Sequence, residues 1–294
     1  MQKAKNLLVV VNPISGGKDK SAFIAYMKAL PETVAVTDWL FWSDAITDMR
    51  VEVKECISKK KYDVVVAAGG DGTANLIAGT LIGLDIAMAI IPFGSGNGLA
   101  RHLKIPLRWK NAVDCVLNGQ VMVMDAAMMN ENYFFCTAGV GFDAHIGHIF
   151  AQLKKRGPLS YVKSVIKEFR KYKPQKYQIT VDGEEMEREA FLITVANAGQ
   201  YGNNAWIAPR ASISDGLLDV TLLSRFNTLQ APLLAHRLFH RSFDKSKKVE
   251  VFRGKNISIL SQNSMPAHFD GEPASMPEKI VYSIIPSAVK IMVP

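Results

Sequence analysis

The sequence has few cysteines, no long apolar run and no compositional bias, and each absence excludes a class of protein. The three cysteines, Cys56, Cys115 and Cys136, are too few and odd in number for a disulfide framework, so we expect a reducing, cytoplasmic setting. The apolar run over residues 7–11 ends at Asn12, which makes it too short for a signal core or a membrane span. Ordinary contents of glycine and aromatic residues exclude fibrous and disordered classes.

The chain is long enough for two ordinary domains or one large one, and it carries a marked positive charge. It has 294 residues, of which 48% are hydrophobic, so it can bury a substantial core. A net charge of +8 suits a nucleic acid, nucleotide phosphates or an anionic membrane as partner. Because the sequence contains no RNA-stacking motif and no zinc finger, we expect no nucleic acid partner.

Residues 1–120 alternate between continuously apolar runs and helix-like stretches. The runs expected to form strands lie at residues 7–11, 34–41, 62–68 and 86–91. The stretches expected to form helices lie at residues 20–30, 44–60, 74–81 and 99–103. This alternation is typical of a parallel sheet covered by helices on both faces, so the sequence predicts a three-layer α/β domain.

After about residue 120, short strand-like runs replace the alternation. They lie at residues 121–126, 133–137, 177–181, 189–196, 217–223, 248–253, 256–261 and 278–284. Their spacing predicts an antiparallel β-sandwich over residues 121–287, interrupted by helices near residues 144–172 and 229–239. A last strand at residues 288–293 is expected to return to the first domain, which would then comprise residues 1–120 and 288–294.

Glycine-rich loops follow three of the expected parallel strands, at residues 12–17, 69–73 and 94–98. Ligands of such sheets bind at the carboxyl ends of the strands, so we expect the three loops to converge on one edge. Glycines allow sharp turns and bring backbone N–H groups close to a ligand, and phosphate is the usual ligand of such loops.

The middle loop, Gly69-Gly70-Asp71-Gly72-Thr73, is the most informative of the three. Its acid would repel a phosphate group unless a metal ion lies between them, or unless the acid takes a proton from an acceptor hydroxyl. Either arrangement points to phosphoryl transfer. Asn75 follows on the next helix and could donate to a phosphate or a ribose.

The first loop ends in Gly17-Lys18 and so resembles a P-loop, but its spacing is wrong. A P-loop needs glycine at position 12 and Ser or Thr at position 19, where this chain has Asn12 and Asp19. A different phosphate loop, with the backbone N–H groups of residues 15–17 as donors, fits the sequence. In the third loop, backbone N–H groups and the Ser95 hydroxyl suit another phosphate or ribose contact.

Two acid-bearing turns lie in the second half. Asp215-Gly216 precedes an expected strand and by itself fits an ordinary turn. Asp270 and Glu272 are two residues apart, so on an extended chain they would point the same way. Paired carboxylates at that separation can divide the roles of base and of metal or water orienter.

The stretch over residues 159–173 has the pattern of a basic amphipathic helix, and the basic residues at 154–156 precede it directly. Its apolar side chains share one face, whereas most of its lysines and arginines lie elsewhere around it. Such a helix can lie on an anionic membrane, and its apolar stripe can equally pack on the sandwich. We expect peripheral contact with the inner face of the membrane through this basic surface.

Together, the five loops resemble those of the bacterial diacylglycerol kinase and lipid kinase family, which includes sphingosine and ceramide kinases. The matching motifs are Asn-Pro-x-Ser-Gly-Gly at 12–17, Gly-Gly-Asp-Gly-Thr at 69–73, Gly-Ser-Gly-Asn at 94–97, Ser-Asp-Gly-x-Leu-Asp at 214–219 and Asp-Gly-Glu at 270–272. The resemblance runs almost end to end. It implies an NAD kinase-like or diacylglycerol kinase-like α/β domain followed by a β-sandwich that binds the lipid.

The resemblance also implies an ATP- and Mg²⁺-dependent lipid kinase with its nucleotide site between the two domains. The residues that it places at the nucleotide are Asn12, Pro13, Ile14, Ser15, Gly16, Ser43, Gly69, Gly70, Asp71, Gly72, Thr73, Asn75 and Ser95. Magnesium would be held by Asp215 and by the backbone carbonyls of Ser212 and Leu217. Glu272, or else Asp270, would activate the lipid hydroxyl as a base, and Asp71 would organise the metal or the nucleotide.

The third loop departs from the form that many bacterial diacylglycerol kinases have, Gly-Thr-x-Asn-Asp-Phe-Ala-Arg. This chain reads Gly-Ser-Gly-Asn-Gly-Leu-Ala-Arg at 94–101, which is closer to sphingosine and ceramide kinases. The acceptor is therefore diacylglycerol, giving phosphatidic acid, or a sphingoid lipid. A soluble NAD kinase and a non-catalytic lipid-binding protein are the other hypotheses, and the sequence leaves a homodimer open.

Overall fold

The computed structural model describes residues 4–42, 46–152, 168–169 and 171–294. The chain divides into two compact units. Unit 1 comprises residues 1–126 and 286–294, and unit 2 comprises residues 127–285. Two strands, β5 (Gln120–Met129) and β16 (Lys279–Val293), contribute residues to both units.

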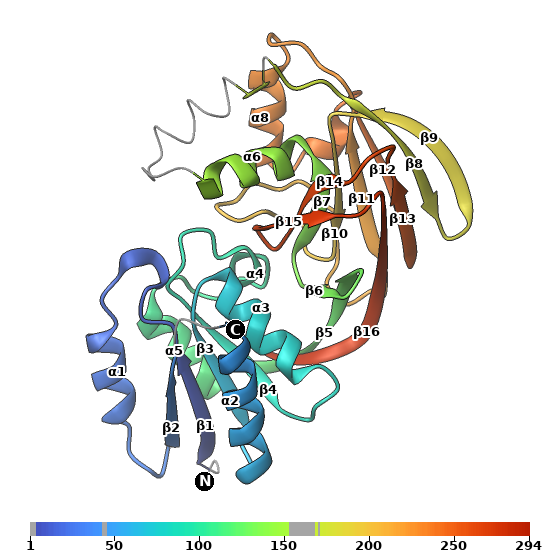
Figure 1. Cartoon of the computed structure of the whole chain (residues 1–294). Helices are drawn as coiled ribbons and strands as arrows, with labels where there is room; N and C mark the ends of the chain where they lie inside the picture. The colour runs from blue at the N-terminus through green and yellow to red at the C-terminus, as the bar shows by residue number, and fades with distance from the viewer. Residues whose placement is uncertain (1–3, 43–45, 153–167, 170) are drawn as a thin grey trace. The chain divides into compact units, whose positions relative to one another are not determined.

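Unit 1 is built on a parallel sheet in which the strands follow the order β2-β1-β3-β4-β16 (Figure 1). The first four strands are β1 (Lys5–Val11), β2 (Ala35–Phe41), β3 (Val64–Gly69) and β4 (Ala87–Pro92). Both β3 and β4 are buried along their whole length, as strands covered on both faces should be. The strand expected over residues 288–293 is the second half of β16, where Lys290 and Ile291 pair with β4.

Helices cover both faces of this sheet (Figure 1). They are α1 (Ser21–Lys28), α2 (Ile46–Lys59), α3 (Asp71–Leu81), α4 (Gly98–His102) and α5 (Trp109–Asn118). The rings of Phe23 in α1 and Trp109 in α5 pack edge to face, with centroids 6.0 Å apart. The sequence prediction lacked α5, although its buried residues Ala112, Val113, Cys115 and Val116 have helical spacing and could have revealed it.

Unit 2 is an antiparallel sandwich. One sheet has the strand order β12-β11-β10-β7-β14-β15, and the strands of the other run in the order β16-β13-β8-β9. Their bounds are β6 (Asn132–Phe134), β7 (Thr137–Gly141), β8 (Gln175–Val181), β9 (Glu184–Ala190), β10 (Leu192–Ala196), β11 (Leu218–Leu223), β12 (Val249–Gly254), β13 (Asn256–Leu260), β14 (Met265–Phe269) and β15 (Glu272–Met276). Buried side chains from both sheets, among them Ile179, Ile259, Val195 and Val220, form one core. Helices α6 (Phe142–Gln152) and α8 (Ala231–Phe239) are inserted between strands.

The strand order of unit 1 fixes where a ligand can bind. The connection from β1 leads outward to β2, whereas the connection from β3 leads the other way, to β4. The loops that follow β1 and β3 therefore leave the sheet on opposite sides of a topological switch point. Open α/β sheets bind ligands at the carboxyl ends of the strands at such a point.

Candidate functional site

The three glycine-rich loops meet at the carboxyl ends of β1, β3 and β4. A Cβ atom built on Gly94 would lie 2.6 Å from the Cα atom of Gly70, and one built on Gly16 would lie 2.0 Å from the carbonyl oxygen of Phe93. Cβ atoms do not approach other heavy atoms so closely. The loops therefore pack backbone against backbone, and only glycine fits at these positions.

Asn12 connects the first loop to the second. Its Oδ1 accepts a hydrogen bond from the N–H of Ile14 at 3.2 Å, and its Nδ2 donates to Oγ1 of Thr73 at 3.3 Å. Of the three N–H groups expected to bind phosphate, those of Ser15 and Gly17 instead donate within the loop, to the carbonyls of Asn12 and Ile14. The prediction of three free donors is therefore wrong, because the loop closes into a short 3₁₀ turn.

Asp71 connects the second loop to the third. It is the first residue of α3, and its Oδ1 accepts a hydrogen bond from the N–H of Gly98 at 2.7 Å. A Cβ atom on Gly96 would lie 2.9 Å from Oδ2 of Asp71, so the glycine leaves room for the carboxylate. The acid is held in place by both loops and is only half-buried, which suits a group that orients a ligand.

Lys20 fastens the first loop by hydrogen bonds to its carbonyl groups. The sequence prediction did not include this residue. Its side chain is buried, and Nζ donates to the carbonyls of Pro13, Ser15 and Lys18 at 3.1, 2.9 and 2.9 Å. Nζ also lies 5.0 Å from the ring centroid of Phe93, at the start of the third loop. Burial lowers the pKa of the Lys20 ammonium, and the three carbonyls compensate for the water that it has lost.

We expect the substitution Lys20→Met to raise the KM for nucleotide about tenfold, because the first loop loses its anchor and a small displacement of a binding loop is costly. Steady-state kinetics measures this change. Lys28→Met is the matched control, since Lys28, the last residue of α1, also lies over an aromatic ring, that of Trp39. Equal effects of the two substitutions would contradict a specific role for Lys20.

The other predicted nucleotide residues differ in what they can offer a ligand. Ser95 is exposed, whereas Asn75 is only 9% exposed and has little surface for a contact. Ser43 lies outside the described residues. The remaining predicted contacts, Pro13, Ile14, Gly69, Gly70, Gly72 and Thr73, all belong to the first and second loops.

Asp270 and Glu272 do not lie on an extended chain, so the expectation that they point the same way is wrong. Asp270 and Gly271 have φ angles of +47° and +86° and form the two-residue turn between β14 and β15. Positive φ at both positions is the conformation that an Asp-Gly pair favours in a tight hairpin. Glu272 is then the first, exposed residue of β15, paired with Phe269.

The Asp270 carboxylate is bound to backbone. Oδ2 accepts from the N–H of Phe135 at 2.8 Å, and Oδ1 accepts from those of Cys136 and Thr137 at 2.8 and 3.1 Å. These bonds fasten the β14–β15 hairpin to the segment between β6 and β7. Because donors hold both oxygens, Asp270 is poorly placed to take a proton from a substrate.

A second Asp-Gly-Glu hairpin in unit 2 supports this assignment. Asp182 and Gly183 join β8 to β9 with φ angles of +47° and +95°, and the Asp182 carboxylate accepts from the N–H groups of Lys255 and Asn256. These backbone donors hold the pKa of Asp182 below its ordinary value. The aspartate of this turn is thus a structural device, which leaves Glu272 as the stronger candidate for the base.

We expect Asp270→Asn to lower the free energy of unfolding by about 2–3 kcal/mol, because the amide group turns a donor toward one of three backbone donors. Denaturant unfolding followed by circular dichroism measures this loss. Unchanged stability together with a complete loss of catalysis would contradict the structural role and restore Asp270 as the base.

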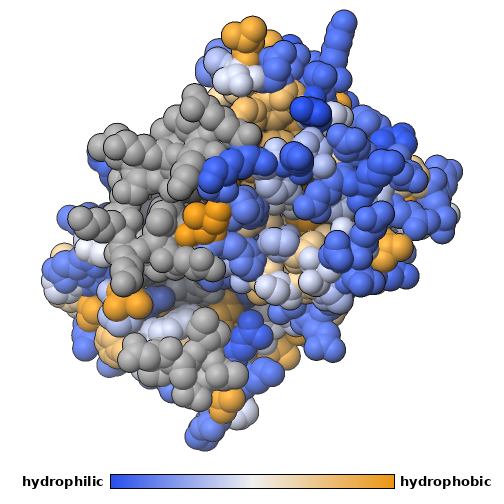
Figure 2. All heavy atoms as spheres, turned by 45° about the horizontal axis from the view of Figure 1, so that its top comes forward, coloured by the Kyte–Doolittle hydropathy of each residue, from blue (hydrophilic) through white to orange (hydrophobic). Residues whose placement is uncertain are grey.

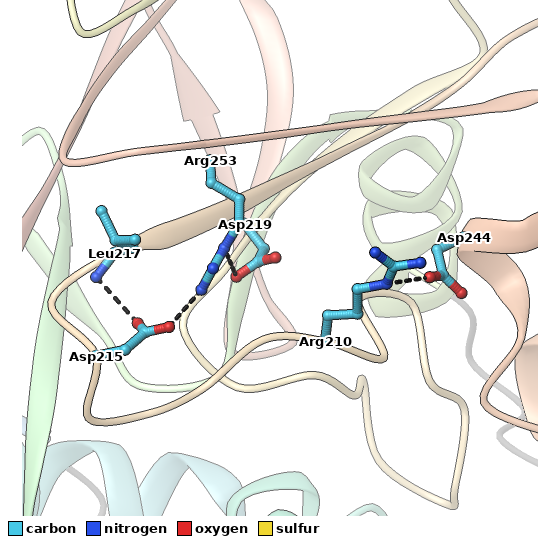
Figure 3. A network of polar contacts seen from close by, with 6 residues as sticks. All are labelled: Arg210, Asp215, Leu217, Asp219, Asp244 and Arg253. Carbon is cyan, nitrogen blue, oxygen red and sulfur yellow. Dashed lines mark hydrogen bonds and ion pairs between the residues drawn. The ribbon is translucent and has the colours of Figure 1, made fainter.

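Asp215, the predicted magnesium ligand, lies in the turn before β11. Its Oδ1 accepts from the N–H of Leu217 at 3.1 Å, and its Oδ2 forms an ion pair with Arg253 (Figure 3). A carboxylate and the carbonyls of Ser212 and Leu217 are the hard oxygen ligands that Mg²⁺ prefers, so the donor set fits. Within the described ranges, no group of three or more His, Cys, Asp or Glu side chains could hold a metal ion.

Arg253 is a second residue that the sequence prediction missed. It lies in β12 directly opposite Asp219 of β11, and its Nε is 3.3 Å from Oδ2 of Asp219 (Figure 3). Burial raises the pKa of the Asp219 carboxyl, and the charge of Arg253 opposes that rise. Strand register brings the two residues together, and register between strands so far apart in sequence cannot be read from a sequence pattern.

Contact with a membrane stays a prediction. Most of the amphipathic helix expected over residues 159–173 lies outside the described residues. No helix in the described part of the chain has the length and apolar character needed to cross a bilayer. On the face that Figure 2 shows, hydrophobic residues are scattered among hydrophilic ones.

Two protein-family models match almost the whole chain. Residues 6–129 match the diacylglycerol kinase catalytic domain, and residues 136–293 match the YegS C-terminal NAD kinase beta sandwich-like domain. The second match alone covers more than half of the chain.

Curated relatives agree with these matches. The chain is 28% identical over 244 residues to a Mycobacterium tuberculosis protein named diacylglycerol kinase, covering 80% of this chain and 78% of the relative. It is 25% identical over 277 residues to a diacylglycerol kinase of Bacillus subtilis, covering 92% and 91%. It is 26% identical over 302 residues to a YegS-like lipid kinase of Pectobacterium atrosepticum, covering 100% and 98%.

Among solved structures, a diacylglycerol kinase from Bacillus anthracis matches 100% of this chain and 98% of its own. The TM-score is 0.76 at 21% sequence identity, so the likeness shows the fold. The predicted fold class, an α/β unit followed by an antiparallel sandwich, is confirmed.

Proposed function

The chain belongs to the family of diacylglycerol kinases and YegS-like lipid kinases, and from this premise we propose that it transfers the γ-phosphate of ATP to the free hydroxyl of diacylglycerol. The observation that carries the proposal is the packing of three glycine-rich loops at the carboxyl ends of parallel strands. Such loops bind phosphate, and their middle member carries the Asp71 carboxylate between two glycines.

In the proposed reaction, the loops hold the triphosphate and Asp71 orients it. Asn12 and Lys20 hold the first loop in shape, and the Asp71–Gly98 hydrogen bond fixes the second loop relative to the third. Position and electrostatic field supply most of the rate in phosphoryl transfer, so rigid loops are what the reaction needs.

Unit 2 supplies the group that activates the acceptor. Glu272 accepts the proton of the lipid hydroxyl while the oxygen of that hydroxyl forms a bond to the γ-phosphorus. The bond between the γ-phosphorus and the oxygen that bridges to the β-phosphate breaks at the same time. The electron pair leaves with ADP. Asp270 takes no part in this transfer and holds the hairpin that presents Glu272.

Asp215, with the carbonyls of Ser212 and Leu217, would hold Mg²⁺. The ion, when bound, offsets negative charge near the phosphates. Omission of divalent cations from the assay, with chelator present, should therefore abolish transfer.

A sphingoid base or ceramide is the alternative acceptor, favoured by the form of the third loop at residues 94–101. An assay that offers equal amounts of diacylglycerol, sphingosine and ceramide in mixed micelles, with NAD in a parallel reaction, identifies the acceptor by thin-layer chromatography of the products. We expect phosphatidic acid as the main product. A phosphorylated sphingoid lipid, or NADP, would overturn the choice of diacylglycerol.

A further inference from the structure

Arg253 forms an ion pair with Asp215, the residue whose carboxylate the proposed magnesium site requires. Its Nη2 pairs with Oδ2 of Asp215 while its Nε contacts Oδ2 of Asp219, so one guanidinium bridges two acids (Figure 3). Two carboxylates and one guanidinium leave the trio with a net charge of −1. A dication and a guanidinium cannot both lie against the same carboxylate oxygen without strong repulsion.

The two contacts of Arg253 differ in how easily they can be broken. The Asp219 side chain is 2% exposed, and β-sheet register places it opposite Arg253, so this contact is an anchor. Asp215 lies in a turn and its side chain is 30% exposed, so water can replace the guanidinium there. Breaking the buried pair would leave an uncompensated charge, whereas breaking the exposed one costs little.

We propose that Arg253 competes with the divalent cation for Asp215. When no metal is bound, Arg253 neutralises the Asp215 carboxylate. When the metal binds, the guanidinium leaves Asp215 and keeps its ion pair with Asp219. The proposal rests on the proposed function, since it takes Asp215 as the metal ligand. Arg253 thereby lowers the affinity of the site for Mg²⁺.

Calorimetric titration of MgCl₂ into the nucleotide-free protein tests the proposal without any measurement of catalysis. We expect Arg253→Gln to bind Mg²⁺ about tenfold more tightly than the wild type, because the carboxylate is released and a nearby positive charge is removed. Arg253→Lys keeps the charge but cannot bridge both carboxylates as the guanidinium does, so its Mg²⁺ affinity should lie between those of the wild type and Arg253→Gln. An unchanged or weaker affinity of Arg253→Gln would overturn the proposal.

Two controls define the site. Arg210→Gln removes a neighbouring arginine that pairs with Asp244 at 2.7 Å and acts on Asp219 through its charge, so it should raise the Mg²⁺ affinity by less than Arg253→Gln does (Figure 3). Asp215→Asn should abolish the binding heat in the wild type and in the Arg253→Gln background. Full binding by Asp215→Asn would show that the metal lies elsewhere and overturn the proposal.

The Arg253→Gln substitution leaves the buried Asp219 carboxylate without its guanidinium partner, a change that can unfold the protein. The double variant R253Q/D219N removes the guanidinium and the buried charge together, and it should also bind Mg²⁺ about tenfold more tightly. The outcomes separate this proposal from the proposed function. If the wild type phosphorylates lipid but Arg253→Gln gains no affinity for Mg²⁺, only the proposed competition by Arg253 is contradicted. If Arg253→Gln gains affinity but the wild type phosphorylates no lipid, only the kinase assignment is contradicted.

Discussion

Replacing Asp71 with asparagine is expected to reduce kcat for phosphate transfer about a thousandfold or more while leaving the fold intact. Asparagine has nearly the same shape, and its side-chain oxygen can still accept the hydrogen bond from the N–H of Gly98. The packing of the second loop against the third should therefore survive. What the substitution removes is the negative charge that the proposal assigns to the nucleotide or its metal.

The matched control is Asp114→Asn, which removes a carboxylate from the exposed side of α5, in the same unit. We expect it to retain the activity of the wild type. Thermal unfolding of Asp71→Asn should give a midpoint close to that of the wild type. A variant at position 71 that retained a tenth or more of the wild-type kcat would contradict an essential role for this acid.

Glu272→Gln should lower kcat by about 10²- to 10⁴-fold, because glutamine cannot accept the proton of the lipid hydroxyl. Glu272 is exposed at the start of β15, so the substitution should not alter stability. Steady-state kinetics and denaturant unfolding measure these two quantities.

The chain contains its own control for this experiment. Glu184 follows Asp182-Gly183 as Glu272 follows Asp270-Gly271, and each glutamate is the exposed first residue of a strand that leaves a two-residue turn. Glu184→Gln should therefore leave kcat unchanged. Equal activity of Glu184→Gln and Glu272→Gln would contradict Glu272 as the base and return attention to Asp71.

Periodicity and apolar runs predicted the fold well because strands buried on both faces have a strong sequence signal. The six-residue strands β3 and β4 and the helices that follow them lie where the pattern placed them. The helix α5 and the strands β14 and β15 were missed, and the single strands expected at residues 133–137 and 189–196 each proved to be parts of two strands. Helix α5 has buried residues with helical spacing that the prediction overlooked, and β14 and β15 are short strands around a turn that was expected to be extended.

The position of the three loops was predicted from the sequence, whereas the side chains that hold these loops and the Asp215 turn in place were not. The convergence of the three loops followed from parallel topology alone, but the bonds of Lys20 to the first loop depend on where the residue before α1 places its side chain. The contact of Arg253 with Asp215 and Asp219 depends on the register of β11 and β12. Such contacts follow from tertiary packing, which one sequence does not disclose.

The central claim is that this chain moves the terminal phosphate of ATP to a lipid hydroxyl. The most direct test incubates the purified protein with γ-labelled ATP, Mg²⁺ and mixed micelles of diacylglycerol, and follows the label in the extracted lipid. The account predicts labelled phosphatidic acid in amounts equal to the ADP formed, and none with Asp71→Asn. Intact ATP and unlabelled lipid, with sphingosine and ceramide as well as with diacylglycerol, would contradict it.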